Sequence, residues 1–462
     1  MIKNGLTIVL ALVASFVIAQ SDSTNNAFSL ARAQQYALEN AYNIQLAKLD
    51  VYRTIKKKKE ITAMGLPQVN AEGSFRNFAQ IPTQVIPNFV EPAIISTLVG
   101  SGQLPVSALD QPLNQPFIES QFGTTFNTSL GVSASQLLFD GSYLVGLKVA
   151  KEYVGFYQQL EEQTNIETKD AVATAYNTVL VAYENKTVLE KSLKNLQKTL
   201  LETKAMYTAG FVQEQDVDQL QITISSLENS IKAAENQAIM SEKLMKLQMG
   251  MDVSESIILT DKLEDIVESL NYEDLSTQNF TVGKHIDYRI LQSNQELMRM
   301  SWKMEKGANL PSLTAFLSHS QSNQVNEINF ETWFPSTVLG VNLSVPIFAS
   351  GHRMYKAQIA QIDYEKVGIQ LTQVEQALQM QSSIAKLELQ TAFDTYQTQK
   401  KNLALTEKIQ QNTVIRYKEG IASSIELTQV QNQYLQTQGN YISSIFQLLN
   451  AKTKLDKAHN NY

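Results

Sequence analysis

Long stretches of this chain place apolar residues at alternating spacings of three and four. When it is sustained over several heptads, such a pattern is typical of a coiled-coil seam. It therefore predicts long helices. If residues 142–206 form a single helix, a rise of 1.5 Å per residue makes it roughly 95 Å long. The predicted seam positions are Val172, Ala175, Val179, Ala182, Lys186, Leu189, Leu193, Leu196, Leu200, Thr203 and Tyr207, then Val217, Leu220, Ile224, Leu227, Ile231, Ala234, Ala238, Ser241 and Met245, and finally Leu427, Val430, Tyr434, Thr437, Tyr441, Ser444 and Leu448.

The remaining faces of these helices are polar but carry few charges. Glutamine recurs through residues 370–438, where a free coiled coil favours Glu and Lys. Such faces suit either helices exposed to solvent or helices packed side by side around a water-filled lumen. Composition alone favours the first interpretation.

The ten prolines of the chain are placed very unevenly. None lies between Pro116 and Pro311, and none follows Pro346. Because proline breaks helix interiors, these two blocks can hold uninterrupted helices. Six of the ten fall in one stretch, at Pro82, Pro87, Pro92, Pro105, Pro112 and Pro116.

Four short runs alternate between apolar and small polar residues, which predicts β-strands. In the clearest of them Phe126, Leu130 and Val132 share one face, and Asn127 and Ser129 lie on the other. This pattern suits a membrane β-barrel strand of about 9–11 residues, and equally a half-buried strand of a soluble sheet. The runs are 69–79, 126–138, 313–320 and 339–347.

Four strands have a consequence if they lie in a membrane. The smallest single-chain barrels need about eight strands, and open strand edges are not tolerated in lipid. A membrane location therefore implies an oligomer, and three chains would supply twelve strands.

The chain also repeats itself. Each half has a Leu-Pro before its first strand, a Phe and a small turn after its second strand, and a Tyr-x-x-Gly between two long helices. Coincidence at three ordered points is improbable, so the sequence predicts an internal duplication. The first repeat carries an insertion at Ile81 to Gln121. The matching pairs are Leu66-Pro67 with Leu310-Pro311, Phe139-Asp140-Gly141 with Phe348-Ala349-Ser350-Gly351, and Tyr207-Thr208-Ala209-Gly210 with Tyr417-Lys418-Glu419-Gly420.

Residues 1–19 have the pattern of a secretory signal peptide. Lys3 precedes an apolar run from Leu6 to Ile18, and Ala19 follows it. The alternative is an uncleaved membrane anchor, but the run is short for a membrane helix of about 20 residues. We therefore expect an exported protein.

Composition removes several classes of function. With 38 Lys and Arg against 45 Asp and Glu, the net charge of −7 argues against a nucleic-acid binder. The absence of cysteine excludes disulfides, thiolate metal sites and a cysteine nucleophile. Four histidines far apart in the sequence leave little for a metal site. Since no catalytic or nucleotide-binding motif occurs, we expect no enzyme activity, no metal and no cofactor.

The order of the repeat resembles the outer membrane factor family, the TolC-like exit ducts of Gram-negative efflux pumps and type I secretion systems. The two Leu-Pro pairs, the two strand exits and the two Tyr-x-x-Gly turns carry the resemblance, together with the opening Phe28-Ser29-Leu30, Ala33, Ala37 to Ala41 and Ile44. The resemblance implies a mainly α fold with a β membrane part. In it three protomers form an α-helical barrel and a 12-stranded β-barrel with four strands from each.

The resemblance also assigns the segments of the chain. Residues 20–250 would be repeat 1, with an extracellular loop at 81–121 and a periplasmic tip at 207–213. Residues 251–283 would be an equatorial segment, and residues 284–462 would be repeat 2, with its tip at 417–423.

The same resemblance implies two groups of site residues. The residues that contact the adaptor would be Gly210, Phe211, Val212, Gly420, Ile421, Ala422 and Ser423, with both glycines at positive φ to reverse the chain. The periplasmic aperture would be formed by Tyr417, Glu426, Gln429 and Asp216. Ala422 stands where some members carry arginine, and Gln429 where the family often has an acid. An acid near a helix N-terminus is also stabilised by the helix dipole, which is the alternative interpretation of Asp216 and Glu426.

The implied function is a passive exit duct in the outer membrane of a Gram-negative bacterium, carrying small molecules or polypeptide from the periplasm to the exterior. Its partners would be two further copies in a homotrimer, a periplasmic adaptor, an inner-membrane transporter and outer membrane lipid. The alternative is a soluble periplasmic coiled-coil adaptor or tether. An adaptor, however, would have one hairpin flanked by small β-domains, whereas this chain has two hairpins and alternating strands.

Overall fold

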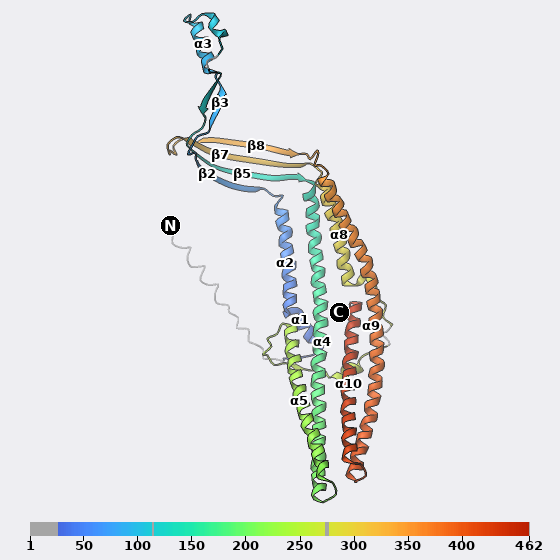
Figure 1. Cartoon of the computed structure of the whole chain (residues 1–462). Coiled ribbons are helices and arrows are strands. Elements are labelled where there is room, and N and C mark those ends of the chain that lie inside the picture. The colour runs from blue at the N-terminus through green and yellow to red at the C-terminus, as the bar shows by residue number, and fades with distance from the viewer. Residues whose placement is uncertain (1–25, 113–114, 273–276, 462) are drawn as a thin grey trace, which may run out of the picture. The chain divides into compact units, whose positions relative to one another are not determined.

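The computed structural model describes residues 26–112, 115–272 and 277–461 (Figure 1). The predicted signal peptide at 1–19 lies outside the described residues. Helices dominate the chain, and the longest strands form one antiparallel sheet. Among the described helices, none combines the length and the apolar content that crossing a bilayer would require.

The two halves of the chain contain the same elements in the same order. Helices α2 (Tyr42–Ala63) and α8 (Ile286–Gly307) have 22 residues each. The next pair, α4 (Gly141–Thr208) and α9 (His352–Lys418), has 68 and 67 residues. The last pair, α5 (Glu214–Met249) and α10 (Ser424–His459), has 36 residues each. These matched lengths confirm the internal duplication.

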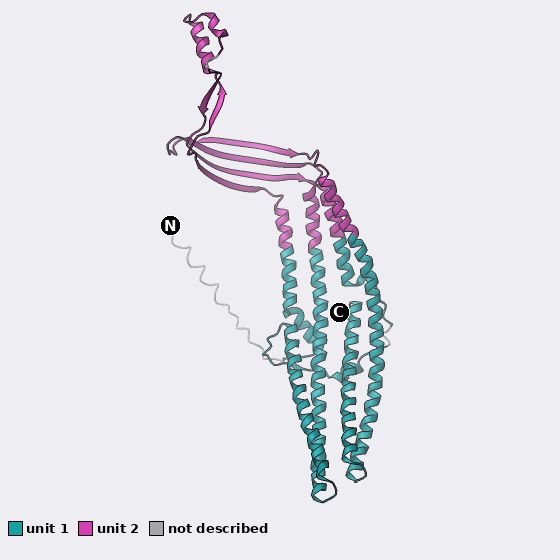
Figure 2. Cartoon of the chain, in the orientation of Figure 1, with its two compact units in different colours: residues 1–54, 154–295, 366–462 teal, residues 55–153, 296–365 magenta. Residues whose placement is uncertain are grey.

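The chain divides into two compact units (Figure 2). One unit contains residues 1–54, 154–295 and 366–462, and the other contains residues 55–153 and 296–365. Each unit therefore takes segments from both repeats. The duplication does not correspond to two separately folded domains.

The second unit contains a four-stranded antiparallel sheet in the order β2-β5-β7-β8. Its strands are β2 (Gln68–Asn77), β5 (Phe126–Asp140), β7 (Ser312–Val325) and β8 (Phe334–Ser344). All four predicted strands are present, and β5 and β7 run past the predicted ends. A register shift between Leu137 and Phe139 interrupts the pairing of β5 with β7.

Residues 81–121, where the sequence predicts only a loop, form regular elements. Strands β3 (Thr83–Pro87) and β4 (Phe117–Gln121) pair as an antiparallel hairpin. Between them lie helix α3 (Val90–Gly100) and the 3₁₀ helix η1 (Val106–Asp110). The prolines that suggest a loop stand at ends or first turns here, where proline is tolerated. Pro87 ends β3, Pro92 lies in the first turn of α3, and Pro105 precedes η1.

The first unit contains the two long helical hairpins and the segment between the repeats. Strand β1 (Ala27–Phe28) pairs in parallel with β6 (Ile258–Leu259), and α6 (Leu263–Glu268) and η2 (Val282–Lys284) follow in the segment that breaks the helical pattern. The phenol of Tyr176 is fully buried and donates a hydrogen bond to the carbonyl of Phe28 at 2.9 Å. Helix α5 is capped at its C-terminus by Gly250, which has φ +72°. Gly250 lies against the end of α1 (Leu30–Asn40), and a Cβ at this position would clash with the backbone of Asn40.

Most predicted seam positions are buried or half-buried, and Tyr207, at the end of its seam, is exposed. Val172, Val179, Leu220 and Met245 have no exposed surface at all. The one charged seam residue, Lys186, is only partly buried and forms an ion pair with Glu235 at 2.9 Å. Burial of the seams within one chain confirms that the 3–4 spacing marks helix packing.

Candidate functional site: hairpin tips and a polar sheet face

The two hairpins turn at glycines in the left-handed region. Gly210 has φ +79° and Gly420 has φ +73°, as the sequence predicts. A Cβ at either position would meet nothing within 4 Å. The requirement for glycine is therefore conformational. In each turn, the glycine and the residue after it donate backbone hydrogen bonds to the preceding helix. In hairpin 1, formed by α4 and α5, Phe211 N–H bonds to Met206 O at 2.9 Å. In hairpin 2, formed by α9 and α10, Ile421 N–H bonds to Arg416 O at 2.8 Å.

The predicted adaptor-contact residues differ in exposure. The side chains of Phe211 and Ile421 are 80% and 64% exposed, which is high for large apolar groups. Val212 is half-buried. Ser423 is exposed, but its hydroxyl accepts a hydrogen bond from the Glu426 N–H at 3.1 Å and so caps α10. Ala422, in contrast, is buried.

The tips of the two hairpins share a small apolar cluster. It includes residues from all four long helices, so the tips pack on each other as well as within each hairpin. The buried members are Leu196, Leu200, Leu220, Ile224, Leu227, Tyr417, Ala422 and Leu427.

Tyr417 lies inside this cluster. Its side chain is 3% exposed, and its hydroxyl is 3.1 Å from the hydroxyl of Thr203 on α4. Burial raises the pKa of Tyr417, so the phenol stays protonated. Its counterpart in the first repeat, Tyr207, is 44% exposed. The same motif therefore places one tyrosine between the hairpins and the other at the surface.

Asp216 serves two purposes. Its carboxylate accepts a hydrogen bond from the backbone N–H of Gln213 at 3.0 Å, in a capping box at the start of α5. The other carboxylate oxygen accepts a hydrogen bond from the hydroxyl of Ser424 on α10. Asp216 is thus a helix N-terminal acid and, in addition, joins the two hairpins.

Glu426 lies in the first turn of α10 and forms an ion pair with Arg416 at 3.0 Å. Both side chains are about half exposed, which makes the pair weak. Lys418 similarly pairs with Glu202 on α4 at 2.9 Å. Gln429, the other predicted aperture residue, is exposed.

Sequence reasoning did not assign four tip residues to the site, although it placed Thr203 in a seam and Lys418 in a turn motif. The four are Thr203, Arg416, Lys418 and Ser424. Arg416 could have been found, because a hairpin that turns near Ile421 brings positions five residues on either side of it opposite each other. The same rule places the uncharged Met206 opposite Asp216 in the first hairpin, so the two tips differ in charge.

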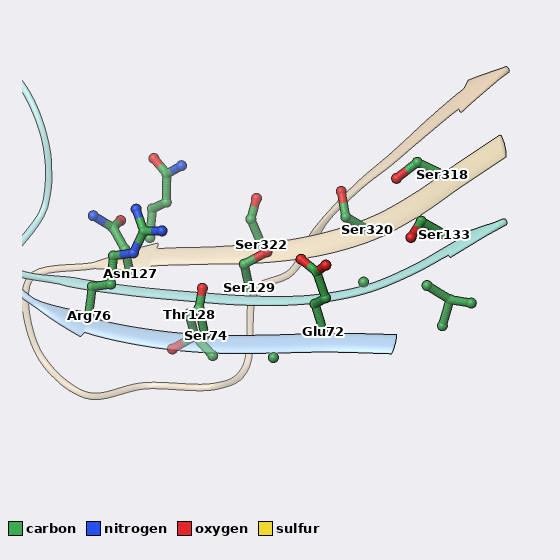
Figure 3. A pocket seen from close by; sticks show the side chains of 14 residues that line it. Glu72, Ser74, Arg76, Asn127, Thr128, Ser129, Ser133, Ser318, Ser320 and Ser322 are labelled. Atoms are coloured by element: carbon green, nitrogen blue, oxygen red, sulfur yellow. The ribbon is translucent and has the colours of Figure 1, made fainter. Parts of the chain in front are cut away.

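The four-stranded sheet has one polar face. In register across β2, β5 and β7 lie Ser74, Ser129 and Ser322, and next to them Arg76, Asn127 and Gln324. The three serines, Arg76 and Asn127 are labelled in Figure 3, and together with Gln324 they line a shallow hollow. Of the fourteen residues that line it, Glu72 and Arg76 are the charged ones. The remaining lining is mostly serine and amide.

The opposite face of the sheet is mainly apolar, although His319 and Gln321 of β7 lie beside Val132 and Leu130, and the described residues leave it exposed. Its residues alternate with the polar set along each strand, and about half or more of each side chain is exposed. They include Leu130, Val132, Leu339, Val341 and Leu343. A sheet with one serine-lined face and one exposed aliphatic face matches strands that separate water from lipid.

In the described part of the chain, no group of three or more His, Asp or Glu side chains is placed to hold a metal ion. The functional features of the structure are its surfaces, namely the exposed hairpin tips and the polar and apolar faces of the sheet.

Residues 103–248 and 290–461 match the model of a protein family described as outer membrane efflux protein. The chain belongs to this family. The two matched segments lie one in each repeat, and together they cover more than half of this efflux protein. No curated protein sequence matches the chain.

Solved structures show the same fold. CusC is 16% identical, with a TM-score of 0.68 over 93% of this chain and 91% of CusC. VceC from Vibrio cholerae is 12% identical, with a TM-score of 0.67 over 93% and 95%. MtrE from Neisseria gonorrhoeae, solved in an open state, is 15% identical, with a TM-score of 0.69 over 93% and 88%.

The family confirms the predicted fold class and location. This efflux protein is an outer membrane protein of a Gram-negative bacterium, with the mainly helical fold and smaller β part of the TolC-like proteins. The family consists of outer membrane channels, which are not a class of enzyme.

Proposed function

We propose that this efflux protein is the outer membrane exit duct of a tripartite efflux pump or a type I secretion system. The observation that carries the proposal is the four-stranded sheet, polar on one face and apolar on the other, joined in sequence to two long helical hairpins with exposed tips. Such a duct performs no chemistry. It conducts small molecules or polypeptide passively once its periplasmic end opens.

The strand edges support a homotrimer. Within the described residues, β2 and β8 each have a strand on one side only. Unpaired backbone groups cost several kcal/mol each in lipid, so the edges need partners. In three copies, β8 of one chain would lie beside β2 of the next. The closed barrel of twelve strands would turn its serine face to the bore and its aliphatic face to lipid.

The hairpin tips are the surface we assign to a periplasmic adaptor, which would link the duct to an inner-membrane transporter. Phe211 and Ile421 project from the two turns and offer apolar contact area. The backbones of Gly210 and Gly420 carry no side chain that would keep a partner away. The buried methyl of Ala422 contributes by holding its turn in place.

The contacts between the two hairpins form the candidate lock of the closed duct. Thr203 with Tyr417, and Asp216 with Ser424, join hairpin 1 to hairpin 2 by hydrogen bonds at buried or partly buried positions. Docking would open the entrance by drawing the second hairpin away and breaking both. The exposed pair of Glu202 and Lys418 adds little, because solvent screens it.

Removing both hydrogen bonds tests this lock. The double variant Tyr417→Phe, Ser424→Ala keeps the apolar packing and the capping box but deletes the two hydroxyls. At about 1 kcal/mol for the neutral bond and about 2 kcal/mol for the bond to the Asp216 carboxylate, the closed state should lose roughly 3 kcal/mol. We expect higher conductance in planar bilayers without any partner.

Tyr207→Phe is the matched control, because this tyrosine occupies the same motif but is exposed. It should leave conductance unchanged. If the double variant conducts no better than this control, the two bonds do not hold the entrance closed.

Fractionation and transport test the proposed function itself. We expect the protein in the outer membrane fraction, extracted only by detergent and migrating as a trimer that heating converts to monomer. Cells that lack it should retain a fluorescent efflux dye, and the intact gene should restore export. Recovery of a soluble monomer would instead support the adaptor or tether alternative.

A further inference from the structure

The inserted segment between β2 and β5 has a defined tertiary structure. Asn88, at the end of the β3–β4 hairpin, is 8% exposed, and its side chain fastens α3 to that hairpin. Its carbonyl oxygen accepts hydrogen bonds from the N–H groups of Val90 and Glu91 at 3.2 and 3.1 Å. Its amide donates to the Gln115 carbonyl at 2.8 Å and to the Glu91 carboxylate at 3.1 Å. The start of α3 is therefore held in one orientation on the hairpin.

Helix α3 presents an apolar stripe that nothing in the described chain covers. No residue of this helix is buried. Phe89, just before it, is 64% exposed, Val90 is 43% exposed and Ile94 is 53% exposed. With a period of 3.6 residues they fall on one side of the helix. That side lines a shallow hollow formed by Phe89, Val90, Ala93, Ile94, Thr97 and Leu98.

The composition of the insert argues against lipid as the occupant of this stripe. Residues 81–121 contain three acids (Glu91, Asp110 and Glu119) and no Lys or Arg. Helices that lie on anionic membrane surfaces are attracted through Lys and Arg. The insert also has no Trp or Tyr, the side chains that anchor segments at a membrane interface.

The position of the insert in the fold favours another copy of this chain as the partner that covers the stripe. Its base continues the ladder between β2 and β5, through a hydrogen bond from Phe78 N–H to Thr125 O at 2.8 Å. That sheet has the open edges that call for neighbouring copies. Whatever closes the sheet around a common axis therefore brings three inserts together at the same ends of the strands.

We propose that the apolar stripe of α3 is a self-association surface on which the α3 helices of three copies pack against one another. Val90, Ala93 or Ile94, and Thr97 follow one another at the three- and four-residue spacings of a helix seam. The proposal rests on the trimer of the proposed function, which a threefold arrangement of α3 would stabilise from the extracellular side.

Cysteine cross-linking tests this surface directly, because the chain has no native cysteine. Thr97→Cys places a thiol on the stripe, and the hydroxyl it removes donates a hydrogen bond to the carbonyl of Ala93 in the same helix. Ser96→Cys is the matched control. It is exposed on the same helix but rotated by about 100°.

In the detergent-extracted protein under mild oxidation, Thr97→Cys should form disulfide-linked dimers at least about tenfold faster than Ser96→Cys. The reason is that thiols at position 97 face each other across the packed helices at an effective concentration of ~mM, whereas those at position 96 point away from the stripe. Ile94→Asp should lower the temperature at which the trimer dissociates, and Ser96→Asp should not.

An intact heat-sensitive trimer in which position 97 links no faster than position 96 would overturn this proposal and leave the proposed function standing. The absence of any trimer would overturn both. A lipid-sensitive dye on position 97 that reports a membrane environment, without cross-links, would show that α3 lies in lipid instead.

Discussion

Replacing Gly420 with valine is expected to abolish efflux while the trimer still assembles. Gly420 has φ +73°, a region in which a side chain costs roughly 1–2 kcal/mol, and a β-branched one is a clear outlier. Since a Cβ there would meet nothing within 4 Å beyond the neighbouring residues of the turn, collision with the rest of the protein plays no part. The turn itself must change, and with it the positions of Ile421 and the buried Tyr417.

Dye efflux from intact cells measures the function, and the heat-sensitive trimer on a gel measures assembly. Gly439→Val is the matched control: Gly439 lies inside α10, where a Cβ also meets nothing within 4 Å but φ is that of a normal helix. Normal efflux in Gly420→Val would contradict the docking role of the turn. Loss of the trimer would show that the turn serves folding instead.

Neutralising either of the two charges on the polar sheet face is expected to change ion selectivity, and the two changes should have opposite directions. Glu72 and Arg76 are four residues apart on β2, which is about 13 Å along the strand. This exceeds the Debye length of ~8 Å at physiological salt. In the trimer each would form its own ring of three like charges, screened from the other. Glu72→Gln should shift the reversal potential in a salt gradient towards anion preference, and Arg76→Gln towards cation preference.

Planar-bilayer recording of the purified protein provides the measurement. Glu331→Gln serves as the control, because Glu331 is an exposed acid in the loop between β7 and β8. Shifts in the same direction for both sheet variants, or a shift no larger than that of the control, would mean that this face does not line the conducting path.

Much of the fold could be predicted because its signals are periodic. The 3–4 spacing marks the buried stripes of α4, α5 and α10, and the alternation marks all four strands of the sheet. The insert escaped prediction for the opposite reason. Strands β3 and β4 have five residues each, too few to establish a period. Helix α3 has apolar residues all around it, so the sequence pattern does not show which of them form the exposed stripe.

At the tips, backbone features could be predicted and side-chain contacts could not. Glycine in a Tyr-x-x-Gly turn predicts its own φ, because only glycine adopts that region freely. The pairing of Thr203 with Tyr417 depends on how far one hairpin is displaced along the other, which no local pattern encodes. The histidines show the same limit. His285 and His459 are far apart in the sequence, yet both rings pack against Phe280.

The unequal tyrosines of the two Tyr-x-x-Gly motifs bear on symmetry. The duplication makes a trimer of this chain look like a ring of six equivalent hairpins. Tyr417 is buried between hairpins and Tyr207 is 44% exposed, so in the proposed trimer the ring would have two alternating kinds of position. Six identical partner molecules could bind such a ring only in two distinct ways. A substitution in one hairpin would alter every second binding position and leave those between unchanged.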